Sequence, residues 1–169
     1  PAGVEVSVDA NNVVTVKGPK GVLTQEVNKV IAVKIDKTEC HFTRNDEEKQ
    51  TKAMHGLYRK LVFNMVEGVT KGYAKSLIVN GVGFKVAKQG KKVVMNIGYS
   101  HPVEFAETDG ITLECPSITE IVVKGIDKDA VGQMAANIRK ARICDPYHAY
   151  GIRYSDEVVV RKEGKKAGK

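Results

Sequence analysis

The densest group of side chains suited to recognition lies near the carboxyl end of the sequence. Four cations are interleaved with aromatic and imidazole rings there: Arg139, Lys140, Arg142 and Arg153 with Tyr147, His148, Tyr150 and Tyr154. Cations bind phosphates and aromatic rings stack on unpaired bases, so this mixture is typical of RNA recognition. A structural role stays open, in which the tyrosine rings pack on a sheet with their hydroxyls at the surface.

A basic segment follows at residues 161–169. Its cations are Arg161, Lys162, Lys165, Lys166 and Lys169, and its one acid is Glu163. A segment without large apolar side chains cannot bury enough surface to fold alone. We expect either an arm that lies along phosphates and becomes ordered on binding, or a solvated terminus.

No arrangement of catalytic or metal-binding residues is recognisable. The segment Gly81-Val82-Gly83 lacks the third glycine of a phosphate-binding loop, and the four histidines are scattered. Cys40 and His41 are neighbours in a predicted strand and therefore point to opposite faces. Cys40, Cys115 and Cys144 have neither zinc-site spacing nor a disulfide pattern. We therefore expect no enzyme, cofactor, metal ion or small-molecule substrate.

The overall composition is that of a basic globular protein. The 169 residues carry a net charge of +7 and are 42% hydrophobic. Such a charge favours nucleic acid as partner, with an anionic membrane or simple solubility as alternatives. Without a long apolar run, a signal peptide or a disulfide pattern, we expect a cytoplasmic protein that does not span a membrane.

The elements that must position these side chains occur twice. At a shift of 80 residues, Val14 falls on Val94, Gly18 on Gly98, Met54 on Met134, Arg59 on Arg139 and Val79 on Val159. The order of elements agrees as well, so the sequence predicts an internal duplication. The predicted fold class is α+β, with two tandem copies of a small, mostly antiparallel sheet covered by one helix. We expect domains at residues 1–80 and 81–160, followed by the basic tail 161–169.

The first copy is expected to contain strands at 4–8, 13–17, 22–27, 30–35, 39–43 and 73–79. Asn45 is predicted to cap its helix, with Asp46, Glu47 and Glu48 in the first turn. The helix is predicted to bury a face of Met54, Leu57, Leu61 and Met65.

The second copy is expected to contain strands at 83–88, 92–97, 111–115, 120–124 and 156–161. Its helix is predicted to begin at an Asp127 cap and to bury Val131, Met134, Ala135 and Ile138.

Several long motifs resemble the bacterial large-subunit ribosomal protein six family along nearly the whole chain. They comprise His55-Gly56 with Arg59, residues 64–73 (NMVEGVTKGY), 79–85 (VNGVGFK), 98–102 (GYSHP), 119–125 (TEIVVKG) and 145–154 (DPYHAYGIRY). The resemblance implies two tandem α+β domains and binding to large-subunit ribosomal RNA near the stalk base and the sarcin–ricin region, where translation factors dock. Expected partners are this RNA, neighbouring ribosomal proteins at the stalk base and nearby translation factors. The family has a short basic stretch before the segment that matches Pro1–Val4, so we expect this chain to start late.

Three positions depart from the family's C-terminal signature. The family normally has Lys where this sequence has His148 and Tyr150, and Pro or Ser at Cys144. Because neutral histidine carries no charge, we expect this loop to bind RNA more by stacking and through Arg142 and Arg153.

We expect the second domain to anchor the protein on RNA. The predicted contacts outside the C-terminal loop and tail are Lys85, Lys88, Lys91 and Lys92 on a hairpin, and His101 in a turn. Arginines can bind phosphate through two hydrogen bonds, so Arg142, Arg153 and Arg161 should matter more than single lysines. His55, Arg59 and Lys60 form a secondary candidate surface on the first helix. A free-standing nucleic-acid-binding regulator and an enzyme are the alternatives.

Overall fold

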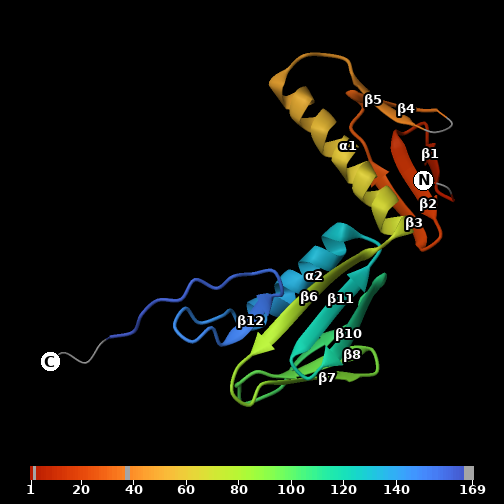
Figure 1. The fold of residues 1–169 in the computed structure, drawn as a ribbon. Coiled ribbons are helices and arrows are strands. Elements are labelled where there is room, and N and C mark those ends of the chain that lie inside the picture. Colours follow the sequence, from red (N-terminus) through yellow and green to blue (C-terminus); the bar gives the residue numbers. More distant parts are fainter. Residues whose placement is uncertain (2, 37–38, 166–169) are drawn as a thin grey trace. The chain divides into compact units, whose positions relative to one another are not determined.

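The chain folds into two α+β units (Figure 1), as the duplication predicts. A computed structural model describes residues 1, 3–36 and 39–165. The first unit comprises Pro1–Tyr73 with the short segment Ile126–Lys128. The second comprises Ala74–Gly125 and the chain from Asp129 onward. The predicted fold class is therefore confirmed.

The first unit contains a three-stranded sheet, a hairpin and a helix. Its elements are β1 (Glu5–Val8), β2 (Val13–Gly18), β3 (Gly21–Glu26), β4 (Ile31–Ile35), β5 (Cys40–Arg44) and α1 (Lys49–Thr70). Strands β1, β2 and β3 pair antiparallel, and β4 pairs with β5. Alternation along β2 buries Val14 and Val16, which join Val62, Met65 and Val69 of α1 in the core.

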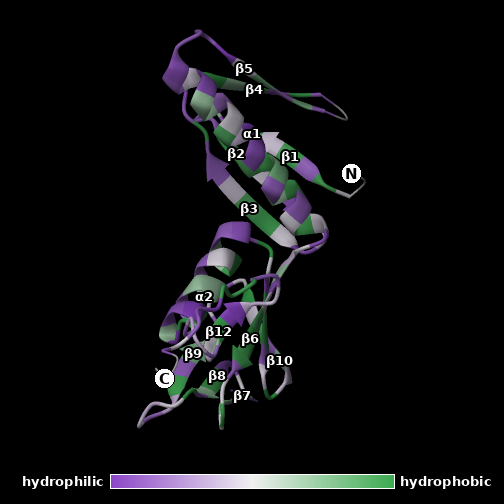
Figure 2. Cartoon of the chain, turned by 60° about the vertical axis from the view of Figure 1, so that its left-hand side comes forward, coloured by the Kyte–Doolittle hydropathy of each residue, from purple (hydrophilic) through white to green (hydrophobic). Residues whose placement is uncertain are grey.

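The second unit contains seven strands and one helix, two strands more than the first. Its elements are β6 (Tyr73–Asn80), β7 (Lys85–Gln89), β8 (Lys92–Asn96), β9 (Val103–Ala106), β10 (Ile111–Ser117), β11 (Glu120–Gly125), α2 (Lys128–Ala141) and β12 (Gly151–Tyr154). They form the sheets β7-β8-β9 and β10-β11-β6-β12. Colouring by hydropathy shows both apolar and polar positions along each helix (Figure 2). Val131, Ala135 and Ile138 are the buried residues of α2.

Strand β6 belongs to the second unit, although it follows the helix of the first copy. It pairs antiparallel with β12, the strand that follows the helix of the second copy, and it also lies beside β11. Leu77 and Val79 of β6 are fully buried there. The division of the chain therefore comes at Tyr73, before the expected boundary after Asn80, because the pairing of β6 lies with the second sheet.

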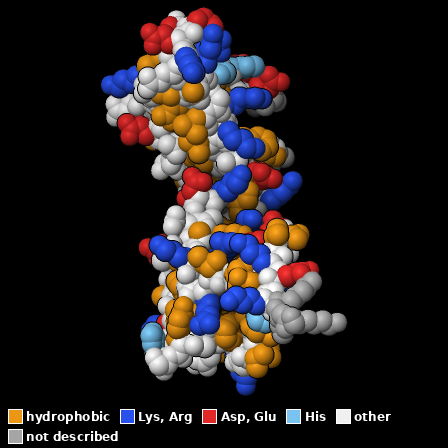
Figure 3. All heavy atoms as spheres, turned by 90° about the vertical axis from the view of Figure 1, so that its left-hand side faces the viewer, with side chains coloured by type: hydrophobic (Ala, Val, Ile, Leu, Met, Phe, Trp, Pro, Cys, Tyr) orange, Lys and Arg blue, Asp and Glu red, His pale blue; other side chains and the backbone are white. Residues whose placement is uncertain are grey.

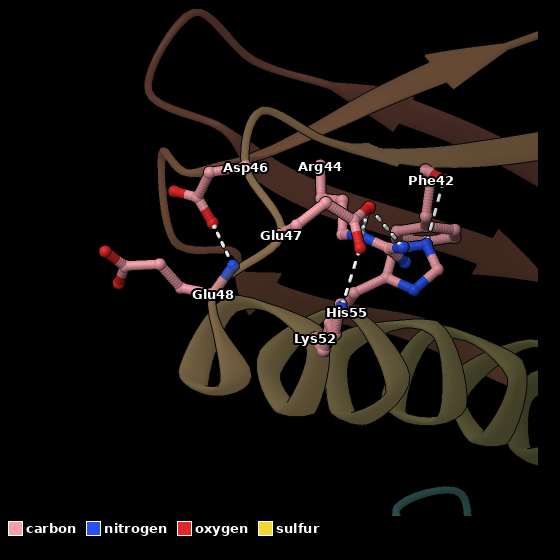
Figure 4. A network of polar contacts seen from close by, with 7 residues as sticks. All are labelled: Phe42, Arg44, Asp46, Glu47, Glu48, Lys52 and His55. Carbon is pink, nitrogen blue, oxygen red and sulfur yellow. Dashed lines mark hydrogen bonds and ion pairs between the residues drawn. The ribbon is translucent and has the colours of Figure 1, made fainter.

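The start of α1 differs from the prediction. The helix begins at Lys49, and its N-cap residue Glu48 makes no side-chain cap bond. Glu47, which was expected in the first helical turn, lies before the helix and accepts hydrogen bonds from Arg44 while pairing with Lys52 (Figure 4). The bond from Lys52 and then those from Arg44 lower the pKa of Glu47. Ion pairing with a strand and the helix therefore replaces the expected capping by Asn45.

Three further predictions about elements need correction. Leu57, which was expected in the core, is 54% exposed because the buried face of α1 is centred on Val62, Met65 and Val69. The last strand is β12 at Gly151–Tyr154 and does not lie at 156–161, where Val158 and Val160 are exposed. Strand β9, the counterpart of β3, was not expected. Its alternation covers only four residues, which is too short a pattern to detect.

Within the described part of the chain, neither helix is long and apolar enough to cross a membrane.

Two glycines of α1 provide a matched test of its packing. A Cβ on Gly68 would overlap the carbonyl oxygen of Ile126, whereas one on Gly56 would meet open space. We expect Gly68→Ala to lower the free energy of unfolding by more than about 2 kcal/mol through overpacking. Gly56→Ala should raise it by about 0.5–1 kcal/mol, because alanine favours the helix. Urea unfolding of both variants measures the difference, and equal effects at the two positions would contradict this packing.

Candidate nucleic-acid interface

The carboxyl end of α2 carries a group of stacked side chains drawn from three distant segments. The Arg142 guanidinium carbon lies 5.4 Å from the ring centre of Phe84 and 5.1 Å from that of Tyr99. The Tyr99 hydroxyl donates to the carbonyl oxygen of Ala141 at 2.9 Å, and the His101 ring stacks on Tyr99 with ring centres 6.3 Å apart. We call Phe84, Tyr99, His101 and Arg142 the arginine–aromatic cluster.

The arginine–aromatic cluster presents rings to solvent while its guanidinium group is held in place. Tyr99 is 49% exposed, and Arg142 is half-buried. Cation–π contact with two rings orients the Arg142 guanidinium and leaves its N–H groups in its own plane able to donate. The cluster can therefore offer hydrogen bonds to a phosphate and a stacking surface to a base without rearrangement.

Residues 145–150, the C-terminal loop, fold around Asp145. The Asp145 carboxylate accepts a hydrogen bond from the His148 backbone N–H at 2.9 Å, and its Oδ2 lies 3.3 Å from His148 Nδ1. The backbone bond is the main cause that lowers the pKa of Asp145. Ala149 is buried with a positive φ of 59°, and its carbonyl oxygen accepts a hydrogen bond from the Asn80 side chain at 3.0 Å. The end of β6 thus holds the base of this loop.

The rings of the C-terminal loop face solvent. Tyr147 is 51% exposed and Tyr150 is 41% exposed. His148 stacks on Tyr150 with ring centres 5.4 Å apart and an angle of 19° between the planes. Neither ring is therefore buried against the protein, and stacking of these rings on bases stays a prediction.

Glu157 fixes the start of the chain that follows β12. Its carboxylate accepts two hydrogen bonds from the Arg139 guanidinium on α2 and one from the backbone N–H of Tyr154. The Arg139 bonds are the main cause of the lowered pKa of Glu157 and of the raised pKa of Arg139. Further along, the Lys162 backbone N–H donates to the carbonyl oxygen of Pro146 at 2.9 Å. Residues 155–162 are thus tied back to the second unit.

Arg153, expected to contact RNA, is engaged within the protein. Its Nη1 donates to the carbonyl oxygens of Glu157 at 3.0 Å and Tyr154 at 3.5 Å. This guanidinium therefore supports the chain after β12, whereas the Arg142 guanidinium lies over the Phe84 and Tyr99 rings. The sequence did not separate the two arginines, since both lie in the stretch 139–154 that contains the tyrosines.

Strand alternation places one of the four hairpin lysines, Lys88, on the inner face of β7. Lys88 shares the inner face of β7 with buried Val86, and its ammonium group binds Glu107 at 2.8 Å and the Leu113 carbonyl oxygen at 2.7 Å. The bond from Lys88 is the main cause that lowers the pKa of Glu107. Lys88 is thus paired within the unit although it is exposed, and an RNA contact by this residue stays a prediction.

The other three hairpin lysines are exposed as Lys88 is, and Lys92 forms an ion pair with Glu104 at 3.2 Å. Lys85 follows Phe84 directly, next to the arginine–aromatic cluster. Lys91 lies in the turn at the far end of β7, about 15 Å away by strand geometry. The structure therefore brings only Lys85 close to the cluster.

The secondary candidates on α1 do not converge. His55 Nε2 lies 3.0 Å from the carbonyl oxygen of Phe42 in β5 (Figure 4), so this ring faces the hairpin. Lys60 Nζ lies 4.3 Å from the ring centre of Phe63, and Arg59 is exposed. His55 and Lys60 are five residues apart and therefore about 140° apart around the helix.

The described cations of the tail are exposed. Arg161, Lys162 and Lys165 are exposed, whereas Lys166 and Lys169 lie outside the described residues. Of the cluster, Phe84 and Tyr99 were not predicted as site residues. Their only signal was their place in Gly-rich turns beside Lys85 and His101.

Within residues 1, 3–36 and 39–165, no three His, Cys, Asp or Glu side chains come close enough to hold a metal ion.

The Glu157–Arg139 pair should make stability depend on pH. The pKa of Glu157 is below its ordinary value of 4.5, so its contribution is present above pH 4.5 and is lost as the pH falls through the folded-state pKa. We expect Glu157→Gln to cost about 1–2 kcal/mol of unfolding free energy at pH 7. Urea unfolding at pH 7 and pH 3 should show the cost shrinking at pH 3. Exposed Glu5→Gln serves as control, and an undiminished Glu157→Gln cost at pH 3 would refute the ionic origin.

Comparison with known proteins gives matches along the whole chain. The family model described as Ribosomal protein L6 matches residues 1–72 and 80–155. Large ribosomal subunit protein uL6 of Caldicellulosiruptor bescii is 57% identical over 169 residues, which cover 100% of this chain and 92% of that protein. The proteins of the same name from Exiguobacterium sibiricum and Mesoplasma florum are 53% and 52% identical, over 98% and 100% of this chain and 92% and 94% of their own lengths. The resemblance found in the sequence motifs is confirmed, and the chain belongs to the ribosomal protein L6 family.

Proposed function

We propose that this chain is a structural constituent of the large ribosomal subunit and binds large-subunit ribosomal RNA through its second unit. The relatives are named as large-subunit proteins, which supports the first part. The single observation that carries the second part is the arginine–aromatic cluster, where Arg142 lies between Phe84 and exposed Tyr99. Such a preformed platform suits unpaired bases and adjacent phosphates.

The C-terminal loop and the tail extend this surface. Tyr147 and Tyr150 offer rings for stacking, and Arg161, Lys162 and Lys165 offer cations for the phosphate backbone. Figure 3 shows Lys and Arg side chains spread among hydrophobic ones over one face of the second unit. Rings and cations together favour folded RNA with unpaired bases over a uniform duplex.

The proposed target is the RNA near the stalk base and the sarcin–ricin region, where translation factors dock. Neighbouring ribosomal proteins at the stalk base and translation factors would then lie near this chain. Its contribution is to stabilise the RNA structure, and it performs no catalysis. This location rests on the family resemblance.

Replacing Arg142 tests the cluster. We expect Arg142→Gln to weaken binding to an RNA fragment of the factor-docking region by about tenfold, because both a charge and its oriented donors are removed. Arg44→Gln is the matched control, since it removes the same charge from a residue paired with Glu47 in the first unit. Filter binding or calorimetry at fixed salt gives both affinities. An equal decrease for the two variants would mean that only net charge acts.

Deleting residues 161–169 tests the tail. The slope of log affinity against log salt should become shallower by about 0.7–0.9 for each phosphate that the tail neutralises in the full chain. The full chain should prefer the fragment carrying the factor-docking region over other large-subunit fragments of equal length. Equal binding to every fragment would leave a general RNA-binding protein, such as a regulator, and would overturn the proposed target.

A further inference from the structure

The chain makes a turn directly after β12, and Glu157 closes it. The Glu157 backbone N–H donates to the carbonyl oxygen of Tyr154 at 3.1 Å, and the Tyr154 N–H donates to the Glu157 carboxylate at 3.1 Å. The Arg153 guanidinium donates to the Glu157 carbonyl oxygen at 3.0 Å. The N–H, the carbonyl oxygen and the carboxylate of Glu157 therefore all take part in this turn.

The Glu157 carboxylate also attaches the turn to α2. Its Oε2 accepts a hydrogen bond from Arg139 Nε at 2.9 Å, and its Oε1 accepts a second bond from Arg139 Nη2. Such a two-bond pair fixes direction as well as distance. The two side chains are only 31% and 26% exposed, so salt screens the pair less than it screens a surface pair. The turn therefore has one preferred course relative to α2.

This course brings the basic tail to the C-terminal loop. The Lys162 backbone N–H donates to the carbonyl oxygen of Pro146 at 2.9 Å, next to Tyr147, whose ring is 51% exposed. Figure 1 shows the segment after β12 passing beside this loop as it leaves the second unit. The cations Arg161 and Lys162 therefore begin the tail beside the exposed rings.

Glu157 has the wrong charge for direct contact with RNA. A carboxylate repels phosphates, and removing this one raises the net charge of the chain by one from +7, so electrostatics alone predicts tighter binding without it. Order in the tail acts in the opposite direction. A segment that is already held loses less conformational entropy when it binds. The sign of the change on removing this carboxylate therefore separates the two effects.

We propose that Glu157 is a positioning residue for RNA binding. Its carboxylate, held by Arg139, directs residues 158–162 to the C-terminal loop and so places the tail cations before RNA arrives. This inference rests on the proposed function, since it concerns how the tail reaches phosphates. It assigns to an acidic residue, which does not contact RNA itself, a favourable contribution to RNA affinity.

The test compares four chains: the unsubstituted chain, Glu157→Gln, the chain without residues 161–169, and the chain with both changes. Filter binding at fixed salt measures their affinities for an RNA fragment of the factor-docking region. We expect Glu157→Gln to weaken binding about fivefold, although it makes the chain more basic. Without the tail, the same substitution should change the affinity by less than about twofold, because the cations that it positions are gone.

Asp156→Asn is the matched control for charge. It makes the same change one residue away, on a side chain that is 74% exposed and lies 3.8 Å from Lys75. Its affinity should be unchanged or up to about twofold higher. Binding by Glu157→Gln that equals or exceeds that of Asp156→Asn overturns the proposal. An equal loss with and without the tail overturns it too, because general damage to the fold would then be the cause.

Amide exchange in the free full chain tests the positioning without RNA. Glu157→Gln should speed exchange of the Lys162 N–H at least about fivefold, measured by NMR. The Ala149 N–H, which donates to the Asp145 carbonyl oxygen within the C-terminal loop, should change by less than about twofold. Unchanged exchange at Lys162 overturns the positioning role whatever the RNA affinities are. Full affinity in the chain without residues 161–169 would instead overturn the tail contact of the proposed function.

Discussion

The antiparallel pairing of β6 with β12 is the interaction on which the rest of the second unit depends. It completes the sheet β10-β11-β6-β12 and buries Leu77 and Val79. It also places Asn80 where its side chain can donate to the carbonyl oxygen of Ala149 in the C-terminal loop. The strand after the first helix thus supports the C-terminal loop of the second copy, for which RNA contact is proposed. A duplicated sequence has in this way produced two units that are not equivalent.

The cations of the second unit fall into two groups, which differ in the groups that they contact. Some bind oxygen atoms within the unit, and Arg142 lies over aromatic rings. Arg139, Arg153 and Lys88 bind carboxylates or carbonyl oxygens within the unit, and they hold the chain after β12 and the β7–β8 hairpin in place. Arg142 contacts only rings through its guanidinium group in the described structure and keeps its donors for a ligand. Charge in a basic protein is therefore not a direct measure of phosphate contact, because a paired cation releases less energy on binding.

The two helices show the same division on a larger scale. Helix α2 has 14 residues and ends three residues before the C-terminal loop begins at Asp145. Helix α1 has 22 residues, buries one face on its own sheet and leaves Leu57 and Phe63 outside. Its two glycines separate these roles, since Gly68 is required by close packing and Gly56 is not. The two helices therefore differ in how much of their apolar surface their own unit buries.

Local pattern was enough to determine the duplication, the α+β class, most strands and the family. Hydrophobic periodicity and motif order are properties of neighbouring residues, so they can be read directly from the chain. The exposure of Tyr147 and Tyr150 was left open by the sequence, where packing on a sheet was an alternative. Only the tertiary structure shows that β6 pairs with the second sheet and that Leu57 faces outward. It also shows that Lys88 and Arg153 bind groups within the unit. The contact of Arg142 with Phe84 and Tyr99 is likewise visible only in the folded chain. Each of these depends on a contact between distant segments or on the exact rotation of a helix, and neither is encoded in the spacing of adjacent residues.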